Sequence, residues 1–440
     1  MPVVSPFRAL LYAPRLRARL DDLVAPPYDV ISDAGRAALA ARHPRNIVHL
    51  DLPRPADGDP YRDAARRLRE WIEGGDLVRE DRPAFYACEQ SFRMPSGQEA
   101  RRQGFFARVT LEPFEAGVVI PHEKTLEQPR TDRHRLLGAT RTHLSAVFML
   151  HPDPGGEVRR LLEEALSTEP LLQAHEPGGG AGSRVARLED SRRTALLAER
   201  LQGAWALIAD GHHRYESALA YRDARRAEGH RDAETVLAYL CSLEDPGLAI
   251  RPIHRLVHSV AGFDPARFLD ALGGLFEMQP IDSEPALAAA LADRRARPGS
   301  FGLALRGRPG YLLAGWRDGA GLERPEMAAL PGALRRLDVI LLHRLVLEGI
   351  LGISPEAQAR QANLEYVKDD REWFARAREP RVDLAVLMNP TRIEQVIEVT
   401  RSGLRLPQKS TYFHPKVLTG LVLDPLDDTP EVRVPPFREG

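Results

Sequence analysis

Groups that could bind a phosphate are concentrated in the segment ADGHHRYESAL, residues 209–219. The apolar run GAWALIAD (203–210) predicts a buried strand, and RYESALAYRDARRA (214–227) predicts the helix after it. Gly211 between them permits a tight turn and a close approach of a ligand to the backbone. Unpaired N–H groups and the positive end of the helix dipole would then point at one spot, which favours a bound anion.

The side chains of this turn could supply several kinds of chemistry. Arg214 could pair with a phosphate group, while His212 and His213 could donate hydrogen bonds or protons. Asp210 could bind a metal ion that a nucleotide carries. The alternative is an ordinary strand–turn–helix in which the histidines face solvent and Asp210 caps the helix. The spacing matches neither the GxxxxGK[ST] phosphate loop nor the HExxH metal motif.

A second dense group of charges, IPHEKTLEQPRTDRHRLL (120–137), contains Glu123 and Lys124. Pro121 and Pro129 predict that much of this segment is loop. Only four lysines stand beside 57 arginines, a bias typical of a GC-rich genome, so a remaining lysine marks a position where arginine would not serve. Glu123 is therefore a candidate base or metal ligand, and Lys124 a candidate phosphate contact. A solvated loop of mixed charge is the alternative.

A third candidate, Asp29, lies in VAPPYDVIS (24–32) behind two prolines that fix the backbone. A carboxylate held in this way is suited to accept a proton from a hydroxyl group. A rigid turn in which Asp29 only caps a helix is the alternative.

Two C-terminal segments, LMNPTRIEQV (387–396) and LPQKSTYFHPK (406–416), place Asn389, Arg392 and Lys409 beside predicted turns. These side chains could bind a substrate. They could equally form a hydrogen-bonding surface between domains.

The elements that must position these residues alternate between β-rich runs and amphipathic helices, which predicts a mixed α+β (α/β) protein. The length predicts two or three domains, and the Ala/Leu-rich helical region at 264–294 indicates a second domain that starts near 262, which gives 1–261 and 262–440. The segment 176–187 has the composition of a flexible loop. The predicted elements are helices at 33–42 (with Ser32 or Asp33 as N-cap), 61–72, 264–294, 332–350 and 391–403, strands at 46–51, 84–90, 104–111 and 382–389, and extended structure near 246–260.

Composition excludes several classes of protein. The chain has 440 residues, 43% of them hydrophobic and 28% charged, which is typical of globular proteins. A formal charge of −1 argues against a dedicated DNA or RNA binder. Cys88 and Cys241 form no CxxC pair, which excludes a disulfide scaffold and fits a reducing compartment. Without a secretory signal or an uncharged apolar run of membrane length, the protein is expected to be cytoplasmic. The sequence leaves the oligomeric state open.

Seven blocks of the sequence together resemble a large prokaryotic family of uncharacterised conserved domains that is often labelled ParB-like. The likeness runs from about residue 24 to residue 422. The family is similar to a branch of the ParB/sulfiredoxin superfamily whose closest characterised relatives are kinases of free L-serine that use ADP or ATP. The blocks are VAPPYDVIS (24–32), NIVHLDLP (46–53), HEKT with TDRHRLL (122–137), LIADGHHRYESAL (207–219), NLEYVKD (363–369), MNPTRIEQV (388–396) and PQKSTYFHPKVLTGLV (407–422).

The resemblance implies roles for individual residues. The block that matches Gly211–Arg214 is the nucleotide-phosphate loop of that superfamily, so this role is implied for Gly211, His212, His213 and Arg214, with Asp210 beside them. The kinases use an acidic residue of an early block as the base towards the serine hydroxyl. Asp29 lies in the comparable block, as Asp and not Glu, and Glu123 is a second candidate.

Other branches of the superfamily fit less well. Sulfiredoxins need a cysteine beside the His-Arg of this loop, where the present chain has His212. Partition proteins need a helix-turn-helix and a basic surface, and the neutral charge of this chain opposes that. The serine kinases are shorter and lack much of the region after residue 262.

The expected activity is transfer of a phosphoryl group from a nucleotide to a small hydroxyl acceptor, with Mg²⁺ and ATP or ADP as implied cofactors. Free L-serine is the first candidate acceptor. His213 is a candidate acid or base, and Lys124 or Arg214 would neutralise charge on the transferred group. A ParB-like nucleotide hydrolase or switch, a non-enzymatic nucleotide-binding regulator and a phosphoserine phosphatase are the alternatives.

Overall fold

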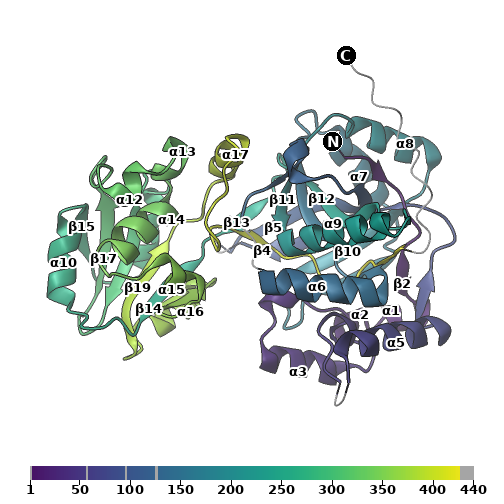
Figure 1. Ribbon diagram of the computed structural model, residues 1–440, viewed down its shortest axis with the longest axis horizontal. Helices are drawn as coiled ribbons and strands as arrows, with labels where there is room; N and C mark the ends of the chain where they lie inside the picture. Colours follow the sequence, from purple (N-terminus) through teal and green to yellow (C-terminus); the bar gives the residue numbers. More distant parts are fainter. Residues whose placement is uncertain (1, 56–57, 95–96, 124–126, 427–440) are drawn as a thin grey trace. The chain divides into compact units, whose positions relative to one another are not determined.

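The computed structural model describes residues 2–55, 58–94, 97–123 and 127–426 (Figure 1). These residues form two compact units: unit 1 consists of 2–121, 127–248 and 415–426, and unit 2 of 122–123 and 249–414. The predicted mixed α+β class is confirmed, because both units combine sheets with helices. Independent folding of two domains divided at residue 261 stays a prediction.

The described part of unit 1 is built on a nine-stranded mixed sheet. Its strands are β1 (Val4–Ser5), β4 (Phe85–Arg93), β5 (Glu99–Thr110), β6 (Val119–Pro121), β8 (Val147–His151), β9 (Leu172–His175), β10 (Gly182–Leu188), β11 (Ala206–Asp210) and β12 (Thr235–Ser242). Their order is β6-β11-β8-β12-β5-β4-β10-β9, and β1 pairs with β5 beside this path. β11 runs parallel to β6 and antiparallel to β8, so two paired neighbours fix the strand that carries Asp210.

Helices surround this sheet. They are α1 (Pro14–Arg17), α2 (Leu20–Leu23), η1 (Tyr28–Val30), α3 (Asp33–Arg42), α4 (Val48–Asp51), α5 (Pro60–Glu73), η2 (Phe114–Ala116), α6 (Glu127–Thr140), α7 (Glu157–Leu166), α8 (Ser191–Arg200) and α9 (His212–Ala227). α6 lies along α9 (Figure 1). In the core, Leu161 of α7, Leu197 of α8 and Tyr215 of α9 join Phe105 and Val147 of the sheet. Burial of this apolar surface is the main favourable contribution to the free energy that packs α9 against the sheet.

The last described segment returns to unit 1. Two short sheets complete the unit: β2 (Leu10–Tyr12) with β3 (Leu77–Arg79), and β7 (Thr142–His143) with β21 (Asp424–Pro425). Backbone bonds join Thr419 to Ala25 at 2.8 Å and Leu10 to Leu423 at 3.0 Å. Nε and Nη2 of Arg108 donate to the buried carboxylate of Asp424. The C-terminal segment is therefore tied to the block that contains Asp29.

Unit 2 is built on a six-stranded sheet in its described residues, with the order β15-β17-β16-β19-β14-β18. The strands are β14 (His254–His258), β15 (Phe276–Ile281), β16 (Ser300–Leu305), β17 (Tyr311–Trp316), β18 (Leu364–Val367) and β19 (Val382–Met388), with a separate pair of β13 (Ala249–Arg251) and β20 (Tyr412–His414). The helices are α10 (Pro265–Gly273), α11 (Glu284–Asp293), α12 (Pro325–Ala328), α13 (Gly332–Arg335), α14 (Asp338–Ile340), the π-helix η3 (Leu341–Glu348), α15 (Pro355–Ala359), α16 (Asp370–Arg376) and α17 (Ile393–Arg401). Trp373 and Leu287 pack with Leu256 and Ala385 in its core.

Several predicted elements are confirmed. The helix at 33–42 is α3, whose N-cap Ser32 accepts the N–H of Gly35 at 3.1 Å. The helix at 61–72 is α5, the strands at 84–90 and 104–111 lie in β4 and β5, and the buried strand at 382–389 is β19. In each case the local pattern and the tertiary environment favour the same structure.

Four predictions were wrong, at least in part. Residues 46–51 form no strand, because the Asn46 amide binds Asp22 and Val24 carbonyls and its Oδ1 accepts the N–H of Val48 at the start of α4. Much of 120–137 is the helix α6, with Pro129 in the first turn where a missing N–H costs little. The supposed loop at 176–187 contains most of β10, which pairs with β4 and β9. The predicted helix at 264–294 is interrupted by the strand β15.

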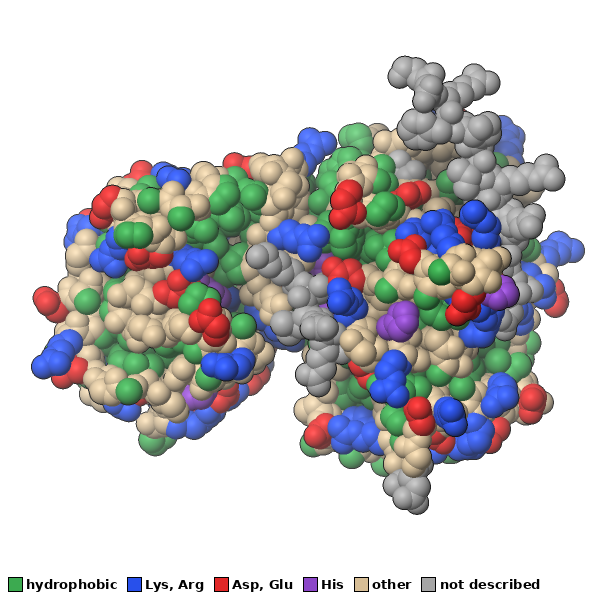
Figure 2. All heavy atoms as spheres, viewed as in Figure 1, with side chains coloured by type: hydrophobic (Ala, Val, Ile, Leu, Met, Phe, Trp, Pro, Cys, Tyr) green, Lys and Arg blue, Asp and Glu red, His purple; other side chains and the backbone are tan. Residues whose placement is uncertain are grey.

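No helix in the described residues is long and apolar enough to cross a membrane. On the face shown in Figure 2, Lys and Arg side chains are interspersed with Asp and Glu side chains over both units. Cys88 and Cys241 are buried and free.

Candidate phosphate site and adjoining cavity

The predicted strand–turn–helix forms at the end of β11. Gly211 is the residue between Asp210 and the start of α9, and its φ of 90° lies in the left-handed region. A Cβ atom at Gly211 would approach three guanidinium atoms of Arg214 at 2.9 Å. Glycine is therefore required twice here, once for the backbone conformation and once for the space that Arg214 occupies.

The carboxylate of Asp210 is held between two cations. Nη2 of Arg214 lies 2.7 Å from Oδ2, and Nζ of Lys416 binds Oδ1. Burial by itself would raise the pKa of Asp210, but Lys416 and Arg214 lower it well below its usual value. One carboxylate and two cations leave an excess positive charge at the N-terminus of a 16-residue helix. This combination favours an anion at the turn.

The surroundings of Asp210 do not fit a magnesium ligand. Both carboxylate oxygens already bind cations, which would repel a divalent ion at the same group. Across the part of the chain that the structure describes, no group of three or more histidine, cysteine, aspartate or glutamate side chains could hold a metal ion. A metal role for Asp210 thus gains no support from this geometry.

His212 and His213 lie in the first turn of α9, as predicted. His212 is buried and close enough to Asp210 to lower the pKa of that carboxyl further, after the larger effects of Lys416 and Arg214. His213 is partly buried. Both histidines thus adjoin the positively charged turn, where either could reach a bound anion.

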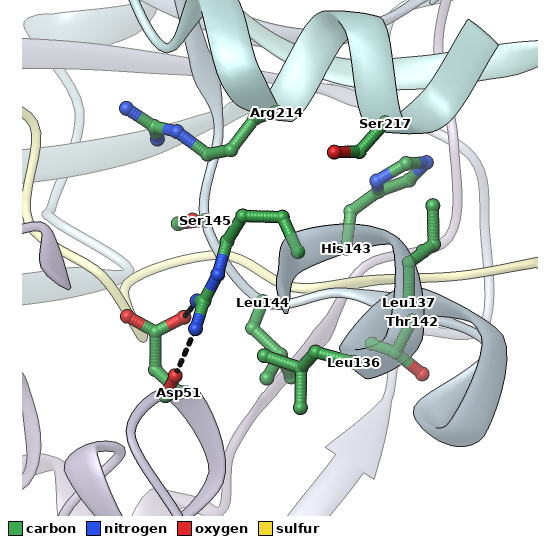
Figure 3. A pocket seen from close by; sticks show the side chains of 10 residues that line it. Asp51, Leu136, Leu137, Thr142, His143, Leu144, Ser145, Arg214 and Ser217 are labelled. Atoms are coloured by element: carbon green, nitrogen blue, oxygen red, sulfur yellow. Dashed lines mark hydrogen bonds and ion pairs between the residues drawn. The ribbon is translucent and has the colours of Figure 1, made fainter. Parts of the chain in front are cut away.

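A cavity of about 40 Å³ lies beside Arg214 (Figure 3). Arg214 and Ser217 come from α9, Asp51 from the end of α4, and the segment before β8 contributes Ser145. The complete lining is Asp51, Arg133, Leu136, Leu137, Thr142, His143, Leu144, Ser145, Arg214 and Ser217. All ten residues belong to unit 1, so the cavity is formed by one compact unit.

Two buried polar atoms of the lining lack a hydrogen-bond partner among the described residues: Oδ2 of Asp51 and Nε of Arg214. The remaining groups of both side chains are engaged. Arg133 donates to Oδ1 and to the carbonyl oxygen of Asp51 at 2.8 and 2.9 Å. Nη1 and Nη2 of Arg214 bind the Ala146 carbonyl and Asp210. Other buried side-chain atoms of the described residues, such as Nε1 of Trp71 and of Trp373, also lack a partner, and Asp51 and Arg214 are distinguished by lining the same cavity.

The block that contains Asp29 reaches the cavity wall through Tyr28. The guanidinium carbon of Arg133 lies 4.2 Å from the centre of the Tyr28 ring. Burial raises the pKa of Tyr28, while Arg133 and Arg214 oppose that rise. Asp29 itself is exposed on η1. The structure therefore brings the early block to Arg133, with Asp29 at the surface beside it.

Glu123 belongs to unit 2, where it lies beside His122 and Thr411. Oγ1 of Thr411 is 2.7 Å from Nε2 of His122 and 3.4 Å from Oε1 of Glu123. Lys124 lies outside the described residues.

The three weaker candidates also belong to unit 2, in contacts that hold its backbone. The buried amide of Asn389 donates to the Leu291 carbonyl at 3.0 Å. The carbonyl of Lys409 accepts from Nη2 of Arg255 at 3.0 Å, and the exposed Arg392 is the N-cap residue of α17. These contacts explain the three residues as parts of the fold. Their role in substrate binding stays a prediction.

Lys416, Asp51 and Arg133 were not among the candidate site residues of the sequence. Lys416 carried a usable signal, since it is one of only four lysines. Asp51 and Arg133 lie within conspicuous blocks, but neither block indicates that the two side chains pair.

The fold and the site define a mixed α+β protein with a positively charged turn at the end of a central strand. The chain belongs to the family described as "Protein of unknown function (DUF1015)", whose model matches residues 4–340. No curated protein matches the chain.

Three solved structures are similar at low identity. A conserved hypothetical protein from Pyrococcus furiosus is 13% identical and has a TM-score of 0.35, covering 74% of this chain and 96% of its own. A free serine kinase variant in complex with AMP is 10% identical with a TM-score of 0.35, covering 70% and 87%. SbnI with a C-terminal truncation, from Staphylococcus aureus, is 9% identical with a TM-score of 0.35, covering 73% and 87%. These scores are too low to establish a common fold, and membership of the ParB/sulfiredoxin superfamily stays a prediction.

Proposed function

We propose that this protein is a nucleotide-dependent phosphotransferase that acts on a small hydroxyl acceptor, with free L-serine as the first candidate. The observation that supports this most is the turn after β11, where Arg214 and Lys416 outweigh the charge of Asp210 at the N-terminus of α9. A nucleotide offers the negative charge that such a turn binds.

Phosphoryl transfer depends mainly on positioning and on stabilising charge. In the proposed mechanism, the start of α9 binds the nucleotide phosphates, and Arg214 and Lys416 neutralise their charge. Gly211 gives the Arg214 guanidinium room beside the turn, because it carries no side chain. His212 and His213 donate hydrogen bonds to the same phosphates.

A base must take the proton of the acceptor hydroxyl as its oxygen forms a bond to the terminal phosphorus and the phosphoanhydride bond to that phosphorus breaks, which releases the shortened nucleotide. Asp29 is the first candidate, because its neighbour Tyr28 contacts Arg133 of the cavity wall. An exposed carboxylate can release that proton to solvent after transfer. Glu123 is the second candidate base and His213 the third.

The surroundings of Asp210 do not fit Mg²⁺, so no step of the proposed mechanism uses the ion at this residue. Asp210 serves instead to orient Arg214 and Lys416. Asn389, Arg392 and Lys409 are not used in this mechanism. A nucleotide hydrolase or switch would use the same turn with water as the acceptor.

Isothermal titration calorimetry with AMP, ADP and ATP tests the phosphate site. Arg214→Ala is expected to weaken nucleotide binding by roughly tenfold or more, because it removes a charged contact. Arg222→Ala is the matched control, since Arg222 is also a buried arginine of α9 and binds the Leu111 carbonyl and Asp223. Equal nucleotide affinity in wild-type protein and Arg214→Ala would refute the assignment.

A further inference from the structure

The cavity beside Arg214 presents one unpaired acceptor and one unpaired donor of opposite charge. Oδ2 of Asp51 has no donor, and Nε of Arg214 has no acceptor, in the described residues. Asp51 is 2% exposed and Arg214 is 9% exposed, so neither atom is compensated by bulk water. We infer that this cavity binds the head group of a small amino acid, with Asp51 accepting from its ammonium group and Arg214 donating to its carboxylate.

The pairing around Asp51 supports an ammonium group at Oδ2. Arg133 binds Oδ1 and the backbone oxygen of Asp51, and its Nε binds Asp132 at 2.8 Å. All three nitrogens of Arg133 therefore already donate to acceptors other than Oδ2. A ligand that brings a positively charged donor satisfies this oxygen, and charge-assisted hydrogen bonds of that kind are among the stronger ones.

The pairing around Arg214 supports a carboxylate at Nε. Nη1 and Nη2 each donate one hydrogen bond, to the Ala146 carbonyl and to Asp210, while Nε is the nitrogen without an acceptor. The same side chain contributes its charge to the phosphate site. One arginine thus adjoins both proposed ligands, which would bring donor and acceptor together for transfer.

The size of the cavity limits the ligand. A volume of about 40 Å³ corresponds to about three bound waters at about 10–15 Å³ each, which limits the ligand in the cavity to a small head group. Leu136, Leu137 and Leu144 form an apolar part of the lining, and Ser145 adds a hydroxyl group. An apolar wall of this kind disfavours a charged ligand side chain beside it. A ligand with only one of the two charges would leave a buried polar atom unpaired, which is a strong basis for discrimination.

The inference depends on the proposed function for what happens to the amino acid, but its binding can be measured without nucleotide. Calorimetry or ligand-observed NMR would compare L-serine with ethanolamine, which lacks the carboxylate, and L-glycerate, which has a hydroxyl in place of the ammonium group at the same configuration. L-serine is expected to bind at least roughly tenfold more tightly than either analogue. Equal binding of ethanolamine or L-glycerate, or no binding of L-serine, L-threonine and glycine, would overturn the inference.

Asp51→Asn keeps the shape of the side chain and removes its charge. It is expected to weaken L-serine binding by roughly tenfold or more while leaving AMP binding unchanged. Asp424→Asn is the matched control, because Asp424 is also buried and paired with an arginine of unit 1 but does not line the cavity. Unchanged L-serine affinity in Asp51→Asn would contradict the inference.

A second variant covers the case in which Asp51→Asn fails to fold. Ser145→Leu introduces volume from a half-buried wall of the cavity without altering either charged group. It is expected to abolish L-serine binding, and retained binding would count against the cavity. L-serine binding without any phosphoryl transfer would refute the proposed function alone. Transfer to an acceptor that lacks an ammonium group would refute the amino-acid site alone.

Discussion

The guanidinium of Arg214 occupies the space that a side chain at Gly211 would fill. A Cβ atom there would lie 2.9 Å from Cζ, Nε and Nη2 of Arg214, closer than such contacts permit. The absence of a side chain at Gly211 therefore allows Arg214 to fold back over the turn and reach Asp210. The conformation of the turn, the position of Arg214 and its ion pair with Asp210 therefore depend on one another.

Gly211→Ala tests whether the side chain of Arg214 depends on the glycine in the turn. The φ of 90° is strained for alanine, which costs about 1–3 kcal/mol, and the new methyl group displaces Arg214. We expect lower stability together with nucleotide binding weakened by roughly tenfold or more. Gly203→Ala is the control, because Gly203 has a φ of 75° in unit 1 and a methyl group there would meet no atom within 4 Å. If both variants lost stability equally and bound nucleotide equally well, the contact with Arg214 would be irrelevant to binding.

Lys416→Met tests the electrostatics of Asp210. The pKa of Asp210 lies below its usual value because Lys416 and Arg214 outweigh the effect of burial. A carboxyl with a lowered pKa stabilises the fold above its unfolded pKa of about 3.9, and this contribution is lost as the pH falls through the folded value. We therefore expect the variant to be less stable by about 1.5–3 kcal/mol at neutral pH.

The difference between wild-type protein and Lys416→Met should shrink as the pH falls through the folded pKa of Asp210 in the variant and then through the lower one in wild-type protein, because the unfolded chains titrate alike and cancel. Urea unfolding of both proteins over a series of pH values measures this difference in the free energy of unfolding. Lys416→Arg keeps the charge and should retain most of the stability. A difference that stays constant down to acid pH would show that Lys416 does not stabilise the ionised form of Asp210.

The ion pair between Arg108 and Asp424 is predicted to hold the C-terminal segment in unit 1, and variants of both residues test this. The ion pair has a distance of 2.7 Å, with side chains that are 4% and 0% exposed. Arg108→Met leaves a buried carboxylate without its partner, which should cost about 3–5 kcal/mol of unfolding free energy. The double variant Arg108→Met with Asp424→Leu removes the stranded charge and should recover a large part of that loss. Chemical denaturation of both variants is the measurement, and equal destabilisation would contradict a dominant role for the buried charge.

The parts of the fold that the sequence predicts correctly are those fixed by neighbouring residues. Ser32 caps α3 through the N–H of Gly35, three positions along the chain. Asp210, Gly211 and Arg214 form one turn because β11 and α9 follow each other directly. Local signals of this kind need no knowledge of the rest of the molecule.

The wrong predictions concern segments whose structure depends on residues far away in the sequence. Asn46 starts a helix instead of a strand because its amide binds the carbonyls of Asp22 and Val24, which are more than twenty residues away. The glycine-rich stretch before β10 is a hairpin turn, since Val185 and its neighbours pair with β4 and β9. Tertiary hydrogen bonds override local composition at both places.

The candidate site likewise depends on contacts between distant residues, which a local sequence pattern does not predict. Lys416 meets Asp210 across 206 positions, and Arg133 meets Asp51 across 82 positions, so no local pattern reports either pair. The rarity of lysine drew attention to the segment of Lys416 without indicating its partner. The cavity depends on both pairs and could be found only in three dimensions.

The central claim is that this protein transfers a phosphoryl group from a nucleotide to a small hydroxyl acceptor. ³¹P NMR of the protein with Mg²⁺, L-serine and either ATP or ADP tests it most directly, with reactions lacking L-serine and the Asp29→Asn variant alongside. We predict a phosphomonoester signal that requires L-serine and is lost or strongly reduced in Asp29→Asn. Loss of nucleotide at the same rate with and without L-serine, with inorganic phosphate as the product, would contradict the claim and identify a nucleotide hydrolase.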